Sequence, residues 1–236
     1  EGAKMSSVLL VTCEHGGNQI PREYRDLFHG ANDVLESHRG WDPGALRAAR
    51  QLAKQLQVEL ISSTTSRLLV ELNRSLHHPR LFSEFTIGLA ASEKQQILNR
   101  WWHPHRRQIV DWIGEAVRQG QQVVHVGVHS FTPVLNGSVR RTDIGLLYDP
   151  RRPSERRLCT QWGRLLKGNL PEMVIHRNQP YRGAADGLTT WLRTQFEDRC
   201  YVGIELEINH RDLHPWTSDS TALIRSVGMT LAEVCG

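Results

Sequence analysis

The sequence predicts an α/β fold, a three-layer α/β/α sandwich built on a mostly parallel mixed sheet. Short apolar runs alternate along the chain with longer segments of helical periodicity, an alternation typical of parallel strands joined by helices. A chain of 236 residues is long enough to bury a substantial core. No internal repeat, low-complexity segment or separating linker is visible, so we expect residues 1–236 to form a single domain.

The expected strands are apolar runs that end in polar or turn-forming residues, as buried strands do. The run VVHVGV at 123–128 is the strongest candidate for a central strand, and its His125 is expected to be a core residue. The run RLLVEL at 67–72 is also expected to be a strand. The full set of expected strands comprises residues 8–11, 58–61, 67–72, 123–128, 144–148, 173–176 and 201–208.

The expected helices carry apolar residues at helical spacing and lie between or after these strands. Asp42 followed by Pro43 is typical of a helix N-terminus, with the aspartate as N-cap and the proline in the first turn. Ser92 and Gln95 suit a capping box at the start of a long helix, which Pro104 is expected to kink or interrupt. The expected helices span residues 46–56, 92–118, 154–167, 188–196 and 220–234.

The composition is that of an ordinary globular protein, with 39% hydrophobic and 23% charged residues. The net charge of +4 comes from scattered arginines interleaved with acidic residues, so no basic stripe indicates a nucleic-acid partner. No apolar run is long enough for a transmembrane helix, and the N-terminal EGAKMSS lacks the apolar core of a signal peptide. The four cysteines lack paired spacing, which argues against a zinc ribbon or disulfide framework and favours a cytoplasmic location.

The stretch VLLVTCEHGGNQIP at 8–21 places Glu14 and His15 directly after the first expected strand. Open α/β sheets bind their ligands at the carboxyl ends of parallel strands, so chemistry is expected here. Gly16 and Gly17 allow the backbone a close approach or a positive φ. A turn that merely holds a histidine explains the stretch equally well, because a lone histidine is weak evidence for a metal.

Three polar side chains, His15, Asp42 and His129, lie at the ends of expected strands or in loops. Two nitrogens and one oxygen with an open fourth position hold catalytic zinc, although iron, cobalt and manganese accept the same ligands. Glu205 and Glu207 share one face of the last expected strand, so either is a candidate general base for a water molecule.

Asn73 and Arg74 follow the expected strand at 67–72, again at the edge where ligands are expected. Arginine suits bidentate recognition of a carboxylate, so Arg74 is a candidate for holding an anionic substrate, and a surface salt bridge is the structural alternative. The motifs HExxH, GxSxG, GxxxxGK[ST] and GxGxxG are absent. Their absence excludes a thermolysin-like protease and argues against a serine hydrolase and a nucleotide-binding protein.

Seven segments follow one another along almost the whole chain: TCEHGGNQIP (12–21), HRGWDPGA (38–45), SRLLVELNRS (66–75), VHSFTP (128–133), IGLLYDP (144–150), NQPYRG (178–183) and IELEIN (204–209). Together and in this order they resemble the N-formylglutamate amidohydrolase family. The resemblance implies a phosphorylase/hydrolase-like α/β fold akin to those of zinc carboxypeptidases and aspartoacylase. It also implies metal-dependent hydrolysis of a small anionic N-acyl amino acid, with N-formyl-L-glutamate giving formate and L-glutamate as the type reaction.

The resemblance also implies which residues hold the metal, with zinc as the first choice. Asn18 stands where carboxypeptidases have the glutamate of their HxxE motif, so the third ligand must come from elsewhere. Glu71 stands where the family usually has aspartate. The implied ligands are His15, His129 and either Asp42 or His38.

The same resemblance implies roles in substrate binding and catalysis. Asn73 and Arg74 correspond to the pair that binds the substrate carboxylate. Glu207, or Glu205 in an alternative alignment, corresponds to the general base, and Glu207 is preferred. Asn178 and Tyr181 correspond to pocket residues.

The expected state of assembly is a monomer or a homodimer. Two other functions remain open, because the sequence does not reveal which acyl group the pocket accepts. One is a related metal-dependent deacylase or peptidase with a different acyl substrate. The other is a ligand-binding member of the fold without catalysis.

Overall fold

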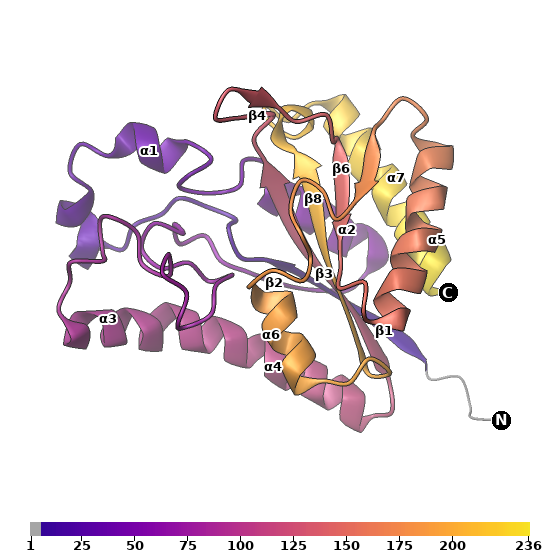
Figure 1. Ribbon diagram of the computed structural model, residues 1–236, viewed down its shortest axis with the longest axis horizontal. Coiled ribbons are helices and arrows are strands. Elements are labelled where there is room, and N and C mark those ends of the chain that lie inside the picture. Colours follow the sequence, from indigo (N-terminus) through magenta and orange to yellow (C-terminus); the bar gives the residue numbers. More distant parts are fainter. Residues whose placement is uncertain (1–5) are drawn as a thin grey trace.

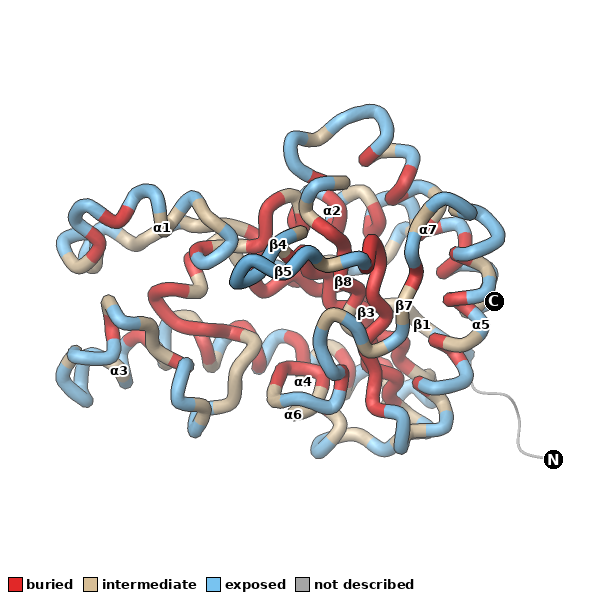
Figure 2. The backbone as a smooth tube through the Cα atoms, turned by 45° about the horizontal axis from the view of Figure 1, so that its top comes forward, coloured by how far each residue is buried: buried red, intermediate tan, exposed pale blue. Residues whose placement is uncertain are grey.

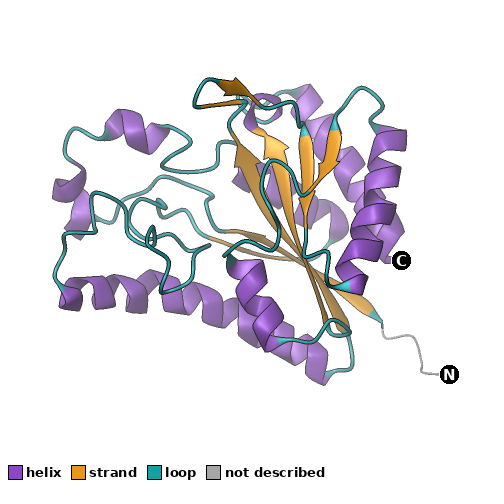
Figure 3. Cartoon of the chain, viewed as in Figure 1, coloured by secondary structure: helices purple, strands orange, loops and turns teal. Residues whose placement is uncertain are grey.

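A computed structural model describes residues 6–236 and shows one central sheet with helices on both faces (Figures 1 and 3). The expected three-layer sandwich with a mostly parallel mixed sheet is therefore confirmed. The expectation that no signal peptide precedes the first strand rests largely on residues 1–5, which lie outside the described residues. No helix in the described part of the chain combines the length and the hydropathy needed to cross a membrane.

The sheet has six strands in the order β2-β1-β3-β8-β6-β7. The first four run parallel, β6 pairs antiparallel with β8, and β7 runs parallel with β6. The carboxyl ends of β1, β3 and β8 therefore meet at one edge, beside the start of β6. The strands are β1 (Ser7–Cys13), β2 (Glu59–Ser62), β3 (Gln122–Phe131), β6 (Ile144–Leu147), β7 (Ile175–Arg177) and β8 (Tyr201–Asn209).

Helices α2 (Ala45–Leu56), α5 (Pro153–Asn169) and α7 (Ser218–Cys235) cover one face of the sheet, and α4 (His103–Arg118) and α6 (Leu188–Gln195) cover the other. Each face has its own apolar cluster, because the valines and leucines of the strands alternate between the two faces. Figure 2 shows the resulting buried strands between partly exposed helices. This burial of both faces is what a largely parallel sheet requires.

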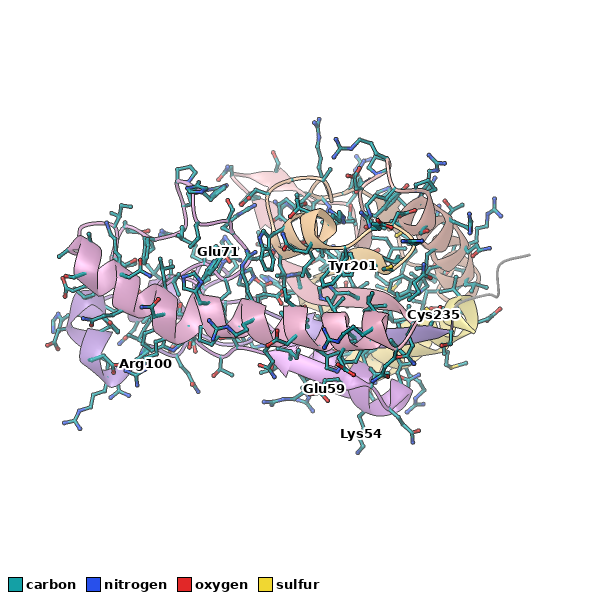
Figure 4. The ribbon with its side chains drawn as sticks, turned by 90° about the horizontal axis from the view of Figure 1, so that it is seen from below. Lys54, Glu59, Glu71, Arg100, Tyr201 and Cys235 are labelled. Atoms are coloured by element: carbon teal, nitrogen blue, oxygen red, sulfur yellow. The ribbon has the colours of Figure 1, made fainter. Side chains whose placement is uncertain are left out.

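A third apolar cluster lies beyond the sheet, between a loop-rich segment and a long helical stretch. The segment holds η1 (Arg22–Phe28) and α1 (Asn32–Glu36), and the helical stretch consists of α3 (Ala91–Ile97), the π-helical turn η2 (Leu98–Trp102) and α4. Figure 4 shows this stretch crossing the underside of the molecule, with the labelled Glu71 behind it. The expected helix at 92–118 is confirmed, and the interruption expected at Pro104 is a π-helical turn just before it.

The predicted capping box of Ser92 and Gln95 is wrong by a few residues. The helix is capped at Ala90, whose backbone N–H donates to Glu93 Oε2 over 3.2 Å. A glutamate in the first turn serves here because it reaches back to an N–H that the helix leaves unpaired.

The predicted strand at 67–72 is also wrong. Residues 67–69 form a turn in which Leu69 N–H donates to Ser66 O over 3.0 Å, and Glu71 N–H donates to Leu81 O of a later loop over 2.9 Å. Leu68, Leu69 and Leu72 are buried in the third cluster rather than in the sheet. An apolar run indicates that a segment is buried, but it does not indicate whether a sheet or a loop buries it. Here the backbone N–H of Glu71 is hydrogen-bonded by a loop residue rather than by a neighbouring strand.

His125 lies in the core, as the sequence predicts. Its Nε2 lies 2.9 Å from Thr12 Oγ1 and its Nδ1 lies 2.8 Å from Tyr201 OH, so one neutral imidazole satisfies two buried hydroxyl groups. Burial lowers the pKa of His125 to about 4, with smaller effects of nearby charges.

We expect His125 to make the fold acid-sensitive between about pH 6.5 and pH 4. In this window the unfolded chain binds a proton at His125 and the folded chain does not, so stability falls as pH falls, by about 3 kcal/mol in total. The variant His125→Gln keeps a donor and an acceptor without titrating. Urea unfolding at a series of pH values should show a shallower loss of stability in this variant, and equal slopes for both proteins would contradict the assignment.

Candidate metal centre

Three buried side chains, His15, Asp42 and His129, converge at the carboxyl edge of the sheet. One ligand atom from each lies within 4.8 Å of the other two. Asp42 Oδ2 is 3.2 Å from His15 Nδ1 and 3.0 Å from His129 Nδ1, and no residue of the three is more than 3% exposed. The structure therefore brings together the three residues that the sequence proposes as metal ligands. The alternative ligand His38 is exposed and does not belong to this cluster.

The sheet places the two histidines. His15 lies just past β1, and His129 lies near the end of the neighbouring parallel strand β3. The sequence places His129 after its strand, but β3 continues to Phe131 and includes it. Gly16 is needed beside His15, because a Cβ there would come within 2.7 Å of the carbonyl oxygen of Ser63.

Asp42 does not cap a helix, contrary to the prediction. Helix α2 begins at Ala45, its N-cap is Gly44 with a φ of 81°, and no side chain caps it. The main chain of Asp42 is held instead by its N–H, which donates to His15 O over 2.9 Å, and by its carbonyl, which accepts from Ala45 N–H over 3.1 Å. The left-handed glycine turns the chain into the helix, which leaves the aspartate side chain free to face the histidines.

A second carboxylate lies behind each histidine. His15 Nε2 contacts Glu71 Oε1, and His129 Nε2 lies 3.2 Å from Glu14 Oε2. The other oxygen of Glu14 lies 3.3 Å from His105 Nε2. Carboxylates on the outer nitrogens of metal-binding histidines orient the rings and make them better ligands.

Sequence reasoning assigned no role to Glu14 or Glu71, although one signal was available for each. Glu14 adjoins a proposed ligand histidine, and Glu71 occupies a position where the resembling family also has a carboxylate. Neither signal reveals that the carboxylate faces the back of an imidazole, because that requires the folded loops.

The buried charges of the cluster stabilise one another. Burial alone would raise the pKa of Asp42, but the charges and hydrogen bonds of His15 and His129 hold it below its usual range. The pKa of His129 is held well above its usual value by Asp42 and Glu14, against the opposing effect of burial. Arg67 completes the network, with NH1 3.1 Å from Asp42 Oδ1 and Nε 2.8 Å from Glu71 Oε2.

The donor set fits a divalent transition metal. Two imidazole nitrogens and one carboxylate oxygen face one another in a buried position, and the carboxylates behind them suit ligands that must stay deprotonated. In the absence of a metal, the same atoms are held together by His–Asp contacts.

Glu207 lies next to this cluster and Glu205 is turned to other partners. Glu207 pairs in register with His129 across β3 and β8, is 6% exposed, and has an Oε2 without a hydrogen-bond partner among the described residues. Burial raises the pKa of Glu207 to about 7, and His129 partly opposes this rise. Glu205 Oε1 instead lies 3.4 Å from both Asn73 Nδ2 and Thr189 Oγ1.

The pair Asn73 and Arg74 lies in the loop after the turns at 67–72. Asn73 is tied down by its amide oxygen, which accepts from Leu188 N–H over 2.6 Å. The Arg74 guanidinium contacts the carbonyl oxygen of Asp186 and borders a cavity of about 500 Å³ that Arg67 also borders.

Tyr181 and Asn178 lie in the loop after β7. Asn178 shapes this loop, because its Oδ1 accepts from the N–H groups of Tyr148 (3.0 Å) and Gly183 (3.1 Å). Tyr181 is partly exposed, and the pKa of its hydroxyl is raised by burial and by the charges of Glu207 and Asp42. The Tyr181 hydroxyl accepts a hydrogen bond from Arg140 over 2.9 Å, whereas the contacts of Asn178 support the loop.

The chain is similar to proteins of known fold along nearly its full length. It matches a structure of the gene product Atu2144 from Agrobacterium tumefaciens with a TM-score of 0.83 and 27% identity, over 96% of this chain and 89% of that one. It matches an N-formylglutamate amidohydrolase from Ralstonia eutropha JMP134 with a TM-score of 0.70 and 15% identity, over 99% and 94% of the two chains. No curated protein sequence matches the chain.

The family comparison is the more specific one. The model of the N-formylglutamate amidohydrolase family matches residues 7–213, a range that contains the three converging ligands and Glu207. The chain belongs to the N-formylglutamate amidohydrolase family and is thus a hydrolase that acts on linear amides.

Proposed function

We propose that this protein is a metal-dependent amidohydrolase that converts N-formyl-L-glutamate to formate and L-glutamate. The observation that carries the proposal is the buried His15–Asp42–His129 cluster with the unpartnered Glu207 carboxylate beside it. A metal site next to a carboxylate of raised pKa suits hydrolysis of an amide by water. Membership of the family supports the substrate class.

His15 Nδ1, Asp42 Oδ2 and His129 Nδ1 would hold the ion, with zinc as the first choice for two nitrogens and one oxygen. When bound, the ion supplies a Lewis acid that activates water and polarises the amide carbonyl. Glu71 and Glu14 keep the two imidazoles oriented toward Asp42.

Glu207 is proposed as the general base. A carboxylate with a pKa of about 7 exchanges a proton near neutral pH, so it accepts one from the attacking water and delivers it to the leaving amine. Arg67 is the nearest cation of the cluster and is proposed to stabilise the negative charge that develops on the amide oxygen. Such a donor contributes roughly 3–4 kcal/mol to transition-state stabilisation.

Arg74 is proposed to bind the substrate carboxylate, because its guanidinium borders the cavity beside the cluster and, among residues 6–236, hydrogen-bonds a main-chain oxygen and no carboxylate. Asn73 holds the neighbouring loop, and Glu205 is proposed to support Asn73 rather than to take the proton. Asn178 is proposed to act through the loop that carries Tyr181.

Purified protein should contain about one zinc per chain and release formate from N-formyl-L-glutamate. Chelation should remove both, and added zinc should restore both, because the three ligands hold the ion that activates water. Elemental analysis and a formate assay on the same sample provide the measurement. Metal without formate release would point to another acyl group, tested with acetyl- and succinyl-amino acids, and absence of both would contradict the proposal.

Glu207→Gln should keep the metal and lose turnover by roughly 10²- to 10⁴-fold, because the amide cannot accept the proton. Glu205→Gln is the matched control on the same strand face and should lose much less. Steady-state kinetics together with metal analysis measure both effects. Loss of metal in Glu207→Gln, or an equal loss of turnover in Glu205→Gln, would show that the base is assigned wrongly.

Arg74→Ala should raise KM more than it lowers kcat, because the carboxylate it binds does not take part in bond cleavage. The loss of one charge-assisted contact predicts an increase in KM of roughly 10- to 100-fold. Arg80→Ala, at another arginine bordering the same cavity, is the control. An unchanged KM in Arg74→Ala would remove Arg74 from the substrate site.

A further inference from the structure

Arg140 is a half-buried arginine at the base of a small hairpin above the metal centre. The hairpin consists of β4 (Val134–Leu135) and β5 (Ser138–Val139) and connects the end of β3 to the start of β6. Figures 1 and 2 show it beside the carboxyl ends of β3 and β8. The backbone N–H of Arg140 donates to Pro133 O over 2.8 Å, which ties Arg140 to the segment that directly follows β3.

The side chain of Arg140 is held in place by aromatic residues. Its NH1 donates to Tyr181 OH over 2.9 Å, and its guanidinium carbon lies 4.9 Å from the centre of the Tyr181 ring and 5.6 Å from that of Phe131. Stacking and a single hydroxyl contact orient the guanidinium but use only one of its five N–H donors. The group is therefore positioned in advance with most of its donors unused.

Arg140 also lacks a carboxylate partner. Within residues 6–236, no carboxylate oxygen lies within 4.0 Å of its guanidinium, whereas Arg67 and Arg193 are each paired with an acidic side chain. Burial weakens the hydration of a cation, and the Tyr181 hydroxyl and the two aromatic rings replace only part of it. An anionic ligand would supply the negative partner that the Arg140 guanidinium lacks among the described residues.

Arg140 lies at the same edge of the sheet as the metal centre. Its partner Tyr181 belongs to the loop that packs over Gly145, where an added Cβ would clash with Gln179 O and would lie 3.4 Å from Glu207 Cβ. Burial and the charges of Glu207 and Asp42 raise the pKa of Tyr181.

The pKa of His38 is lowered by partial burial and by the positive charges of Arg67 and Arg140. Both arginines therefore lie near His38. Arg74 borders the cavity beside the cluster, and Arg140 lies in the connection between β3 and β6 at the same edge of the sheet. Within residues 6–236, neither Arg74 nor Arg140 pairs with a carboxylate.

We propose that Arg140, held by Tyr181, determines specificity by binding a second carboxylate of the substrate, the side-chain carboxylate of an acidic N-acyl amino acid. This proposal rests on the amidohydrolase function above, in which Arg74 binds the α-carboxylate. A ligand with one carboxylate pairs with one of the two arginines, and a dicarboxylate that reaches both pairs with both. Arg140 is accordingly a selector among acyl amino acids and takes no part in bond cleavage.

Binding of product-like acids by the zinc-loaded protein tests the proposal without requiring turnover. The probes are glutarate, with two carboxylates, and valerate, which has the same chain length and only one. Titration calorimetry should show tighter binding of glutarate than of valerate by the unchanged protein. Arg140→Gln should weaken glutarate binding by roughly 10- to 100-fold and valerate binding much less.

Arg141→Gln is the matched control, since Arg141 is the exposed neighbour of Arg140. It should bind glutarate like the unchanged protein. Arg140→Lys keeps the charge without the planar fork and should retain part of the glutarate preference, which guards against a loss caused by misfolding. Glutarate bound no more tightly than valerate, or bound equally by Arg140→Gln, would overturn the proposal.

Hydrolysis assays distinguish the proposed role of Arg140 in specificity from the proposed amidohydrolase function on which it rests. The ratio of kcat/KM for N-formyl-L-glutamate to that for N-formyl-L-glutamine should fall in Arg140→Gln, because glutamine has the same shape without the charge. Absence of formate from both substrates with the unchanged, zinc-loaded protein would count against the proposed function. The glutarate titration would still decide whether Arg140 binds a second carboxylate.

Discussion

The buried carboxylate of Asp42 between two imidazoles is the interaction on which the rest of the site depends. A carboxylate removed from water is stable only with compensating partners, and Asp42 has His15, His129 and Arg67. Each histidine in turn carries a second carboxylate on its outer nitrogen. Together these groups keep negative and positive charge nearly matched within a small volume, and a divalent ion held there would replace the protons that raise the charge of the histidines.

The sheet makes this arrangement possible because the site gathers strands that are distant in sequence. The parallel neighbours β1 and β3 bring His15 and His129 to one edge, and β8 brings Glu207 opposite His129. The antiparallel direction of β6 is equally important for the site, because it makes β6 begin at the edge of the sheet where β3 ends. The short connection between them therefore stays above the site, and it is this connection that carries Arg140.

Much of the fold and of the metal centre was predictable from the sequence. Buried strands and amphipathic helices have distinct apolar periods, so six of the seven expected strand runs and the flanking helices could be located. The polar residues at strand ends indicated the edge where a ligand is expected. The run at 67–72 was mistaken for a strand because burial in a loop-lined cluster produces the same apolar pattern as burial in a sheet. Asp42 was mistaken for a helix cap because Asp-Pro suits that role, and the pattern does not show that the glycine at 44 starts the helix.

By itself, the sequence determined the α/β class, the two strands that position His15 and His129, and a small set of carboxylates that contains the candidate ligand and the candidate base. Only the tertiary structure showed that Asp42, and not His38, lies with the two histidines, and that Glu207 lies beside them while Glu205 contacts Asn73. Only it revealed Glu14, Glu71 and Arg67 as neighbours of the cluster and Arg140 at the same edge of the sheet. The reason is physical. Local patterns reflect periodic burial along the chain, whereas the role of a charged side chain depends on which distant groups share its buried volume, and that is set by how the loops pack across the sheet edge.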